Sequence, residues 1–227
     1  RIAAEHIDCT HHELLFTKQE YYEALPIVIK KLESYDPSLV RCAIPCYFTC
    51  KLAADYVTVV LTGEGADELF TGYHYMKHFP MELLNKEARR CIGNLHNINL
   101  QRADRMGMLF SLELRVPFFD TDLIDLGMKV SPSLKIREQD GQKIEKWILR
   151  HAFADWGYLP DEILWRQKEQ FSDGVGYGWI DAIKAFTAEQ VSDAEMARAA
   201  GRFPFNTPAS KEAYWFRTVF ERHFPLA

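Results

Sequence analysis

Apolar residues recur at helical spacing over most of the chain, and one short segment has the pattern of a buried strand. Residues 57–62 are β-branched and apolar on both parities, which predicts a strand buried on both faces. A glycine turn follows at residues 63–68, and a short helix is expected after it. The order helix, buried strand, glycine turn, helix is typical of an α/β fold with a parallel sheet.

The first 55 residues contain two predicted helices. Residues 12–16 have the composition of a short strand, and Thr17 to Glu20 form a capping-box sequence that predicts the start of a helix. Pro26 is expected to break or kink that helix, because proline removes a donor and clashes with the preceding turn. Residues 35–38 read as a turn, and Pro45 fits the first turn of a second helix that ends near Asp55.

The remainder of the chain is predicted to be mostly helical. Helical periodicity indicates helices at residues 82–99, 123–128 and 144–153, and a last helix around residues 210–223. Residues 165–178 interrupt this periodicity and are polar and rich in glycine. We interpret them as a long loop of the kind that is often functional.

Composition and charge exclude several classes of protein. The 227 residues are 48% hydrophobic and 26% charged, which excludes a disordered chain and fits one large domain or two small ones. The net charge of −5 gives no basic footprint for nucleic acid or an anionic membrane. The sequence also shows no signal peptide and no transmembrane segment, and its five cysteines are few. Together these features predict a cytoplasmic protein.

The glycine turn after the predicted strand has the strongest chemical signature. Ligands of open α/β sheets bind beyond the carboxyl ends of strands, and Gly63 and Gly65 would let the backbone approach a ligand closely. Glu64, Asp67 and Glu68 would repel a bare phosphate, so a phosphate fits only if Mg²⁺ bridges the two. The alternative is an acidic first helical turn that the helix dipole favours.

Basic residues in the long loop form the second candidate. Arg166 and Lys168 could hold phosphoryl oxygens as charge develops on them, or belong to an ordinary solvated loop. Arg41 could recognise a carboxylate in bidentate fashion or form a surface ion pair. We interpret Glu113 and Arg115 as structural.

Three cysteines and one acidic residue are given structural interpretations. Cys42, Cys46 and Cys50 share one face of a predicted helix, and we interpret them as small buried thiols rather than a metal site. Asp120 is expected to cap the helix that follows it.

Several long sequence blocks resemble one family in order along nearly the whole chain. They are similar to the synthetase domain of glutamine-hydrolysing asparagine synthetases. The blocks are residues 33–36, 61–70 (Leu-Thr-Gly-Glu-Gly-Ala-Asp-Glu-Leu-Phe), 113–120 (Glu-Leu-Arg-Val-Pro-Phe-Phe-Asp), 165–174 (Trp-Arg-Gln-Lys-Glu-Gln-Phe-Ser-Asp-Gly), 203–208 and 211–214. The resemblance implies an adenine nucleotide alpha-hydrolase-like parallel sheet, truncated at its N-terminus, with a helical C-terminal part. Residues 1–227 would be the C-terminal portion of that synthetase domain.

The resemblance also implies a reaction. Aspartate and ATP with Mg²⁺ would give β-aspartyl-AMP and pyrophosphate, and ammonia from a separate glutaminase domain would then displace AMP. Thr62 and Gly63 would contact the nucleotide, and Glu64 would support formation and breakdown of the acyl-adenylate. Asp67 would hold Mg²⁺ on the pyrophosphate.

Three further residues receive roles from the resemblance. Lys168 would stabilise charge at the α-phosphate and on the leaving pyrophosphate, Arg41 would lie near aspartate, and Tyr73 would line the site. These roles require Asp67 and Lys168 to face each other although they are distant in sequence.

The chain departs from the family pattern in ways that leave alternatives open. It lacks the family's Ser-Gly-Gly-Leu-Asp-Ser phosphate loop and the glutaminase with its nucleophilic cysteine, so the chain alone is expected to be inactive. The partners expected for this chain are a second copy in a homodimer or an N-terminal complementing segment. Asn99 stands where some members have Asp, and Leu39 replaces a Thr of some relatives. The alternatives are a non-catalytic interaction module, or a related adenylating amidotransferase with another substrate.

Overall fold

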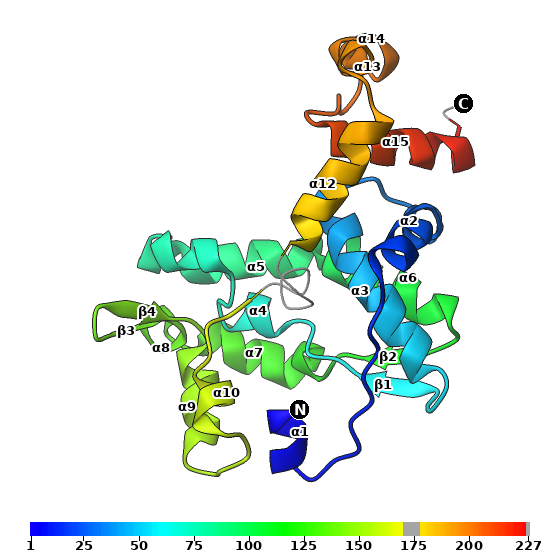
Figure 1. The fold of residues 1–227 in the computed structure, drawn as a ribbon. Coiled ribbons are helices and arrows are strands. Elements are labelled where there is room, and N and C mark those ends of the chain that lie inside the picture. The colour runs from blue at the N-terminus through cyan, green and yellow to red at the C-terminus, as the bar shows by residue number, and fades with distance from the viewer. Residues whose placement is uncertain (170–177, 226–227) are drawn as a thin grey trace. The chain divides into compact units, whose positions relative to one another are not determined.

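The structure is a computed structural model that describes residues 1–169 and 178–225 (Figure 1). The chain divides into two units. The first unit comprises residues 1–13, 59–100 and 114–168, and the second comprises residues 14–58, 101–113 and 169–227. Each unit has its own set of buried residues, and they are described separately below.

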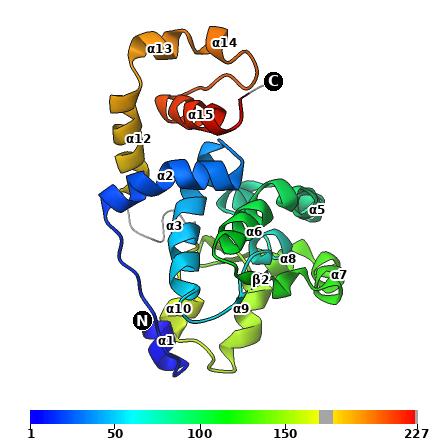
Figure 2. The same ribbon diagram turned by 90° about the vertical axis from the view of Figure 1, so that its right-hand side faces the viewer.

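The second unit is built from helices. Helix α15 packs against both α2 and α12, and α2 packs against α3 (Figure 2). A cluster of Val191, Ala199, Phe203 and Tyr214 forms part of its core. The helices are α2 (Lys18–Leu32), α3 (Pro37–Ala53), α6 (Asn99–Leu109), which begins in the first unit, α12 (Trp179–Gln190), α13 (Asp193–Ala197), α14 (Ala199–Arg202) and α15 (Lys211–His223).

Local capping rules explain where these helices begin. The capping box of Thr17 and Glu20 is confirmed, and Ser210 caps α15 close to its predicted start. Pro26 does not break its helix, and the helix start predicted at Pro45 is wrong. Helix α2 continues through Pro26, and α3 begins at Pro37 and runs through Pro45, because Asp36 caps it and Pro37 occupies a first-turn position that needs no donor. The strand expected at residues 12–16 is also wrong, since this segment pairs with no strand among the described residues.

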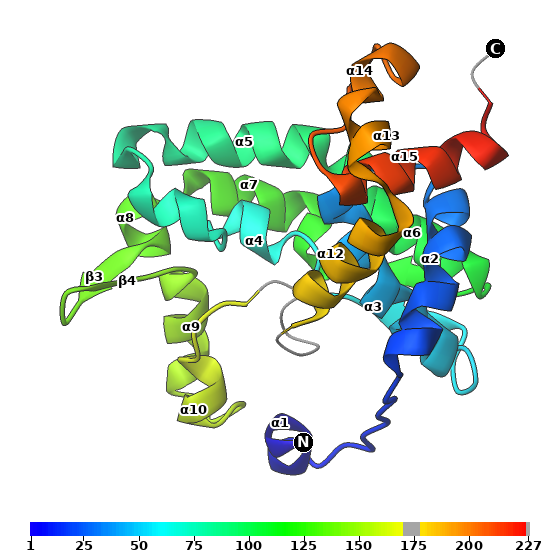
Figure 3. The ribbon, with the colours of Figure 1, turned by 45° about the horizontal axis from the view of Figure 1, so that its top comes forward.

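The first unit consists of short helices around two small sheets. Helix α4 packs against α5 and α7 (Figure 3). Met76, Leu84 and Ile136 form a buried cluster with Tyr73 and Phe79 against it. The elements are α1 (Ile2–His6), β1 (Val59–Leu61), α4 (Ala66–Leu69), η1 (His74–His78), η2 (Met81–Leu83), α5 (Leu84–Asn94), η3 (Leu95–Asn97), β2 (Glu113–Arg115), η4 (Pro117–Phe119), α7 (Thr121–Lys129), α8 (Pro132–Lys135), β3 (Arg137–Gln139), β4 (Gln142–Ile144), α9 (Trp147–Ala154) and α10 (Asp161–Leu164).

The predicted strand exists, but its burial was predicted wrongly. Strand β1 pairs with β2, and the bonds from Glu113 N–H to Thr58 O and from Thr62 N–H to Arg115 O show that the two run parallel. Leu61 is 71% exposed. The apolar pattern describes a strand in the middle of a sheet, whereas the described residues provide only one neighbouring strand.

A β-hairpin was missed by the pattern analysis. Strands β3 and β4 pair antiparallel with Gln139 opposite Gln142, and the turn residues Asp140 and Gly141 both have positive φ. Asp-Gly is a strong local signal for this turn. The helix expected from residue 144 therefore begins only at Trp147.

Other helix predictions are confirmed with altered bounds. The segment predicted as 82–99 divides into α5 and η3. Helix α7 covers the predicted residues 123–128, and the Asp120 carboxylate accepts hydrogen bonds from two backbone N–H groups at its start. No helix among the described residues has both the length and the apolar character needed to cross a bilayer.

The cysteines match their structural interpretation only in part. Cys50 is buried, whereas Cys42 and Cys46 are half-buried, and all of them are free thiols. Within residues 1–169 and 178–225, no group of three or more metal-ligating side chains is present.

Lys135 is a buried lysine in the first unit, and it links the stability of that unit to pH. Its side chain is fully buried, and its ammonium donates to Asn85 Oδ1 at 2.9 Å. Burial lowers the pKa of Lys135 to about 8. The unfolded chain therefore holds more protons than the folded one between pH 8 and the ordinary lysine pKa, so stability should rise with pH across that window.

Lys135→Met is expected to remove this component of the pH dependence. The measurement is the urea midpoint at several pH values from 7.5 to 10, compared between wild type and variant. The control is Lys129→Met, which changes an exposed lysine and should keep the wild-type dependence of the urea midpoint on pH. If the urea midpoint changes with pH in the same way in wild type and in Lys135→Met, the buried amine does not titrate in this range.

Candidate functional site

The acidic loop lies at the carboxyl end of β1, as the sequence predicted. Thr62 N–H donates to Arg115 O at 2.9 Å, which holds the loop's start against β2. Gly65 has φ +97° and a Cβ there would lie 2.6 Å from the Phe119 ring, so the turn into α4 requires glycine. Asp67 is thereby placed in the first turn of α4.

Asp67 lies between two ammonium groups from distant parts of the chain. Lys146 Nζ is 2.6 Å from its Oδ1, and Lys168 Nζ is 3.3 Å from its Oδ2. All three side chains are 20–23% exposed. The structure thus brings Asp67 and Lys168 together, as their predicted roles require, and adds Lys146 to them.

Gly72 leaves no room beside this cluster. A Cβ at Gly72 would overlap Asp67 Oδ1 and Lys146 Cε, and would lie 2.9 Å from Asp67 Cγ. Gly72 N–H also donates to Asp67 O at 2.7 Å. The missing side chain is therefore part of what positions the Asp67 carboxylate.

The Asp67 carboxylate is the side chain of this loop that could hold a magnesium ion. Its Oδ1 is buried and has no hydrogen-bond partner among the described residues, although the Lys146 ammonium lies 2.6 Å away. Mg²⁺ is usually bound through one or two carboxylates together with water and substrate phosphates. A single carboxylate beside two cations that could meet phosphate oxygens fits this pattern.

A buried ion-pair network holds the backbone of both lysine segments. Glu145, 2% exposed, pairs with Lys77 at 2.5 Å and with Arg150 at 2.7 Å. Burial alone would raise the pKa of Glu145, but the hydrogen bond from Lys77 and the charges of Lys77 and Arg150 hold it below its ordinary value. Glu145 directly precedes Lys146, which has a left-handed backbone at φ 54°.

Arg150 extends the network to the second lysine. Its guanidinium donates to Leu164 O at 2.5 Å and to Arg166 O at 3.0 Å. These bonds fix the backbone just before Lys168. Residues 145–150 therefore position both ammonium groups that flank Asp67.

Tyr73 belongs to a second buried network near the loop. Its hydroxyl donates to the buried Glu68 carboxylate, and Asn99 Nδ2 donates to Glu68 at 3.1 Å and to the Tyr73 hydroxyl at 2.8 Å. Burial, and then the Glu68 charge, raise the pKa of Tyr73 far above its ordinary value, so the phenol remains a donor. Asn99 supplies donors at this position, where an ionised Asp would add a second negative charge.

Tyr73→Phe is expected to destabilise the protein by about 1–3 kcal/mol, because a buried carboxylate then loses a donor. Tyr75→Phe is the matched control, since its hydroxyl donates to Glu87 at 2.6 Å in an exposed position and should cost little. The free energy of unfolding in urea measures both. Equal and small losses of unfolding free energy in the two variants would show that the Tyr73 hydroxyl does not stabilise the buried Glu68 carboxylate.

The remaining loop residues and Arg41 have different surroundings. Thr62 and Glu64 are half-buried and Gly63 is exposed, and Glu64 N–H faces Thr62 Oγ1 at 3.4 Å. Arg41 belongs to the second unit, where Nε donates to Glu212 Oε1 at 2.8 Å and a second bond joins the same two side chains. Arg41 therefore forms an ion pair, as the second alternative has it, but with the buried Glu212 and not at the surface, and this bidentate pair occupies the guanidinium.

Sequence reasoning missed Lys146 and the Glu145 network. Lys146 follows a hairpin that was itself missed, and nothing in the local pattern links it to Asp67. Arg166 is exposed, and Glu113 and Arg115 are exposed at the ends of β2. The glycine-rich part of the predicted loop, residues 170–177, lies outside the described residues.

Comparisons with known proteins agree with the sequence blocks. A family model described as asparagine synthase matches residues 1–92 and 80–227. A glutamine-hydrolysing asparagine synthetase of Brassica oleracea is 45% identical over 226 residues, which cover 98% of this chain and 39% of that protein. A nodule form from Pisum sativum is 46% identical with the same coverages, and one from Zea mays is 44% identical over 99% of this chain and 39% of its own length. This chain therefore spans about two fifths of the length of these relatives.

Proposed function

Because the chain belongs to the asparagine synthase family, we propose that it supplies one half of an ATP-binding site for amidation of aspartate to asparagine. The observation that supports this best is the Asp67 carboxylate held between Lys146 and Lys168 at the carboxyl end of a parallel strand. Cations and a metal-binding carboxylate at that position suit the phosphates of a nucleotide.

The first step would be adenylation. A β-carboxylate oxygen of aspartate attacks the α-phosphorus of ATP, a new P–O bond forms, and the bond to the leaving pyrophosphate breaks. Lys168 would stabilise the negative charge that grows on the phosphoryl oxygens, and Lys146, which also contacts Asp67, would provide a second ammonium. Mg²⁺ held by Asp67 would neutralise charge on the pyrophosphate.

The second step would be aminolysis. Ammonia, delivered by a glutaminase domain in the complete protein, attacks the carbonyl carbon of β-aspartyl-AMP, and AMP leaves with the bonding electrons. Glu64, which lies half-buried in the same loop, is our candidate for support of both steps. Thr62 and Gly63 would contact the nucleotide, Tyr73 would line the site, and Arg41 would hold an aspartate carboxylate.

The exposed strand indicates how the rest of the site would be built. Val59 and Leu61 are exposed in a strand whose pattern suits burial on both faces. Further parallel strands beside β1 would extend an adenine nucleotide alpha-hydrolase-like sheet, and helices packed on its face would cover these side chains. We propose that an N-terminal segment or a second polypeptide provides those strands and the second phosphate loop, in a cytoplasmic enzyme.

Isotope exchange tests the proposed function. The complete protein with ATP, Mg²⁺ and aspartate should exchange labelled pyrophosphate into ATP, and it should do so without ammonia. Exchange with another carboxylic acid but not with aspartate would favour a related adenylating enzyme. ATP binding without any exchange would favour a non-catalytic module.

A further inference from the structure

A cavity of about 540 Å³ in the first unit has a strongly basic lining, which includes the Lys77, Glu145 and Arg150 network that positions the two lysines of the Asp67 site. It lies beside the β3–β4 hairpin and is bounded by η1 and by residues 165–167. None of the residues proposed for catalysis lines it. The cationic and potentially cationic lining residues are His74, Lys77, His78, Lys143, Arg150 and Arg166.

The cavity has a surplus of positive charge. Four lysine and arginine side chains face two carboxylates, those of Glu138 and Glu145, which leaves a net charge of +2 before any histidine is protonated. Glu145 is buried and already contacts Lys77 and Arg150. It is therefore too well neutralised to repel an anion strongly.

The basic lining is held in place by bonds to the backbone. Lys143 Nζ donates to Lys77 O at 2.8 Å, and Arg150 donates to Glu145 O at 3.0 Å as well as to residues 164 and 166. The rings of His74 and His78 lie 5.6 Å apart on η1. These bonds fix the positions of the cationic groups, so their positive charge can attract a small anion with little reorganisation of the protein.

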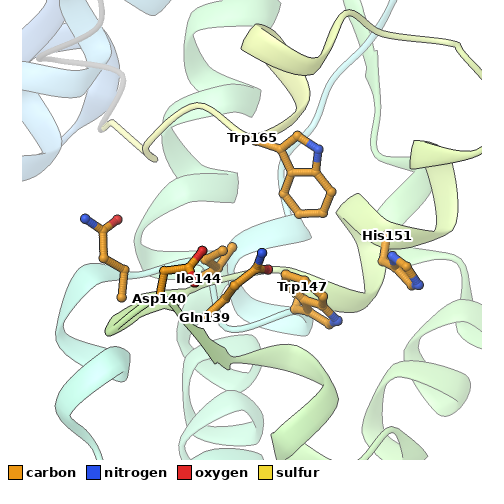
Figure 4. Close-up of a pocket in the computed structure, with 7 residues that line it drawn as sticks. Gln139, Asp140, Ile144, Trp147, His151 and Trp165 are labelled. Carbon is orange, nitrogen blue, oxygen red and sulfur yellow. The ribbon is translucent and has the colours of Figure 1, made fainter.

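The neighbouring cavity on the hairpin has a different character (Figure 4). It measures about 610 Å³ and its walls include Trp147, Trp165 and His151, with ring centroids 5.4 Å apart for the two indoles. Trp165, Gln142 and Ile144 border both cavities. The aromatic side offers no comparable cationic lining, so an anion would prefer the basic side.

We propose that the basic cavity is a second anion site, distinct from the Asp67 site, that binds a pyrophosphate group. Pyrophosphate carries several negative charges, so it suits a lining with surplus positive charge better than a single carboxylate would. The volume lies in the range of small-ligand pockets. The ligand is either free pyrophosphate or the pyrophosphate group of a larger metabolite.

Calorimetry in the Lys168→Gln background tests this proposal without any need for catalysis. Chelator in the buffer removes metal-dependent binding at Asp67, and inorganic pyrophosphate is the probe. Adding Lys143→Gln and Arg166→Gln should weaken binding by at least about tenfold, since each removes a cation that faces the ligand. Adding Lys129→Gln, which removes an exposed charge outside the cavity, should leave binding unchanged.

The outcomes separate this proposal from the proposed function. Loss of all binding in Lys168→Gln alone, or equal weakening by Lys129→Gln, would overturn the second site while leaving the exchange assay to judge the reaction. Uridine diphosphate in the same background distinguishes the two sources of ligand. Tighter binding of uridine diphosphate would indicate that the ligand is the pyrophosphate group of a larger metabolite. Tighter binding of inorganic pyrophosphate would indicate that the ligand is the free anion.

Discussion

Lys168→Met in the complete protein should lower aspartate-dependent pyrophosphate exchange by roughly a hundredfold or more, which is the usual cost of removing one preorganised donor to developing charge. Methionine keeps most of the apolar stem and removes only the ammonium group. Asp67 would still pair with Lys146, so the fold should persist. The loss should therefore appear in the chemical step.

The kinetic form of the loss distinguishes charge stabilisation from simple binding. If Lys168 acts mainly on the phosphoryl charge that develops in the transition state, kcat should fall while KM for ATP changes little. Lys168→Arg should recover part of the activity, because it restores the charge with a different geometry. Lys129→Met, at the exposed end of α7, is the control and should exchange like wild type.

A Lys168→Met variant that keeps wild-type exchange would contradict the assigned role. A variant with lower exchange and a lower unfolding midpoint would instead show that Lys168 supports the fold. Circular dichroism and a urea titration on the same preparations separate these two outcomes.

The local elements were predictable because their causes are local. Thr17 and Glu20 satisfy each other's backbone donors within one turn, and Asp120 caps α7 in the same way. Pro45 misled the prediction because the same argument applies to Pro37, which has the capping Asp36 directly before it. When two prolines could each begin a helix, the helix begins at the one that follows a capping residue.

The burial of β1 and the role of Lys146 could not be read from the sequence for a different physical reason. The apolar pattern of residues 57–62 indicates a strand that suits burial on both faces. It does not indicate whether the described residues bury that strand. Lys146 reaches Asp67 only because the β3–β4 hairpin and the Glu145 network place it there. The place of Lys146 in the site depends on tertiary contacts. Asp67 and Lys168, in contrast, could be identified from the sequence blocks that resemble the family.

Gly72→Ala is expected to damage the site from a position that makes no side-chain contact at all. The backbone at Gly72 lies outside the left-handed region, so alanine fits the local conformation and only the added methyl group matters. That methyl would overlap Asp67 Oδ1 and Lys146 Cε, and the pair must separate to admit it. Overpacking of this kind costs typically about 1–3 kcal/mol of stability.

The effect on activity should exceed the effect on stability, because Asp67 is the carboxylate proposed to hold Mg²⁺. Pyrophosphate exchange should fall by at least about tenfold, the scale on which small misplacement of a reacting group acts. Raising the Mg²⁺ concentration should restore part of it, since a displaced ligand weakens metal binding.

Gly93→Ala is the matched control for this substitution. Gly93 lies in α5, and a Cβ there meets nothing within 4 Å, so alanine should be neutral or stabilise the helix by about 0.5–1 kcal/mol. If Gly72→Ala retains both stability and exchange at low Mg²⁺, the crowding around Asp67 does not govern its position. The inference that Gly72 positions the Asp67 carboxylate would then be wrong.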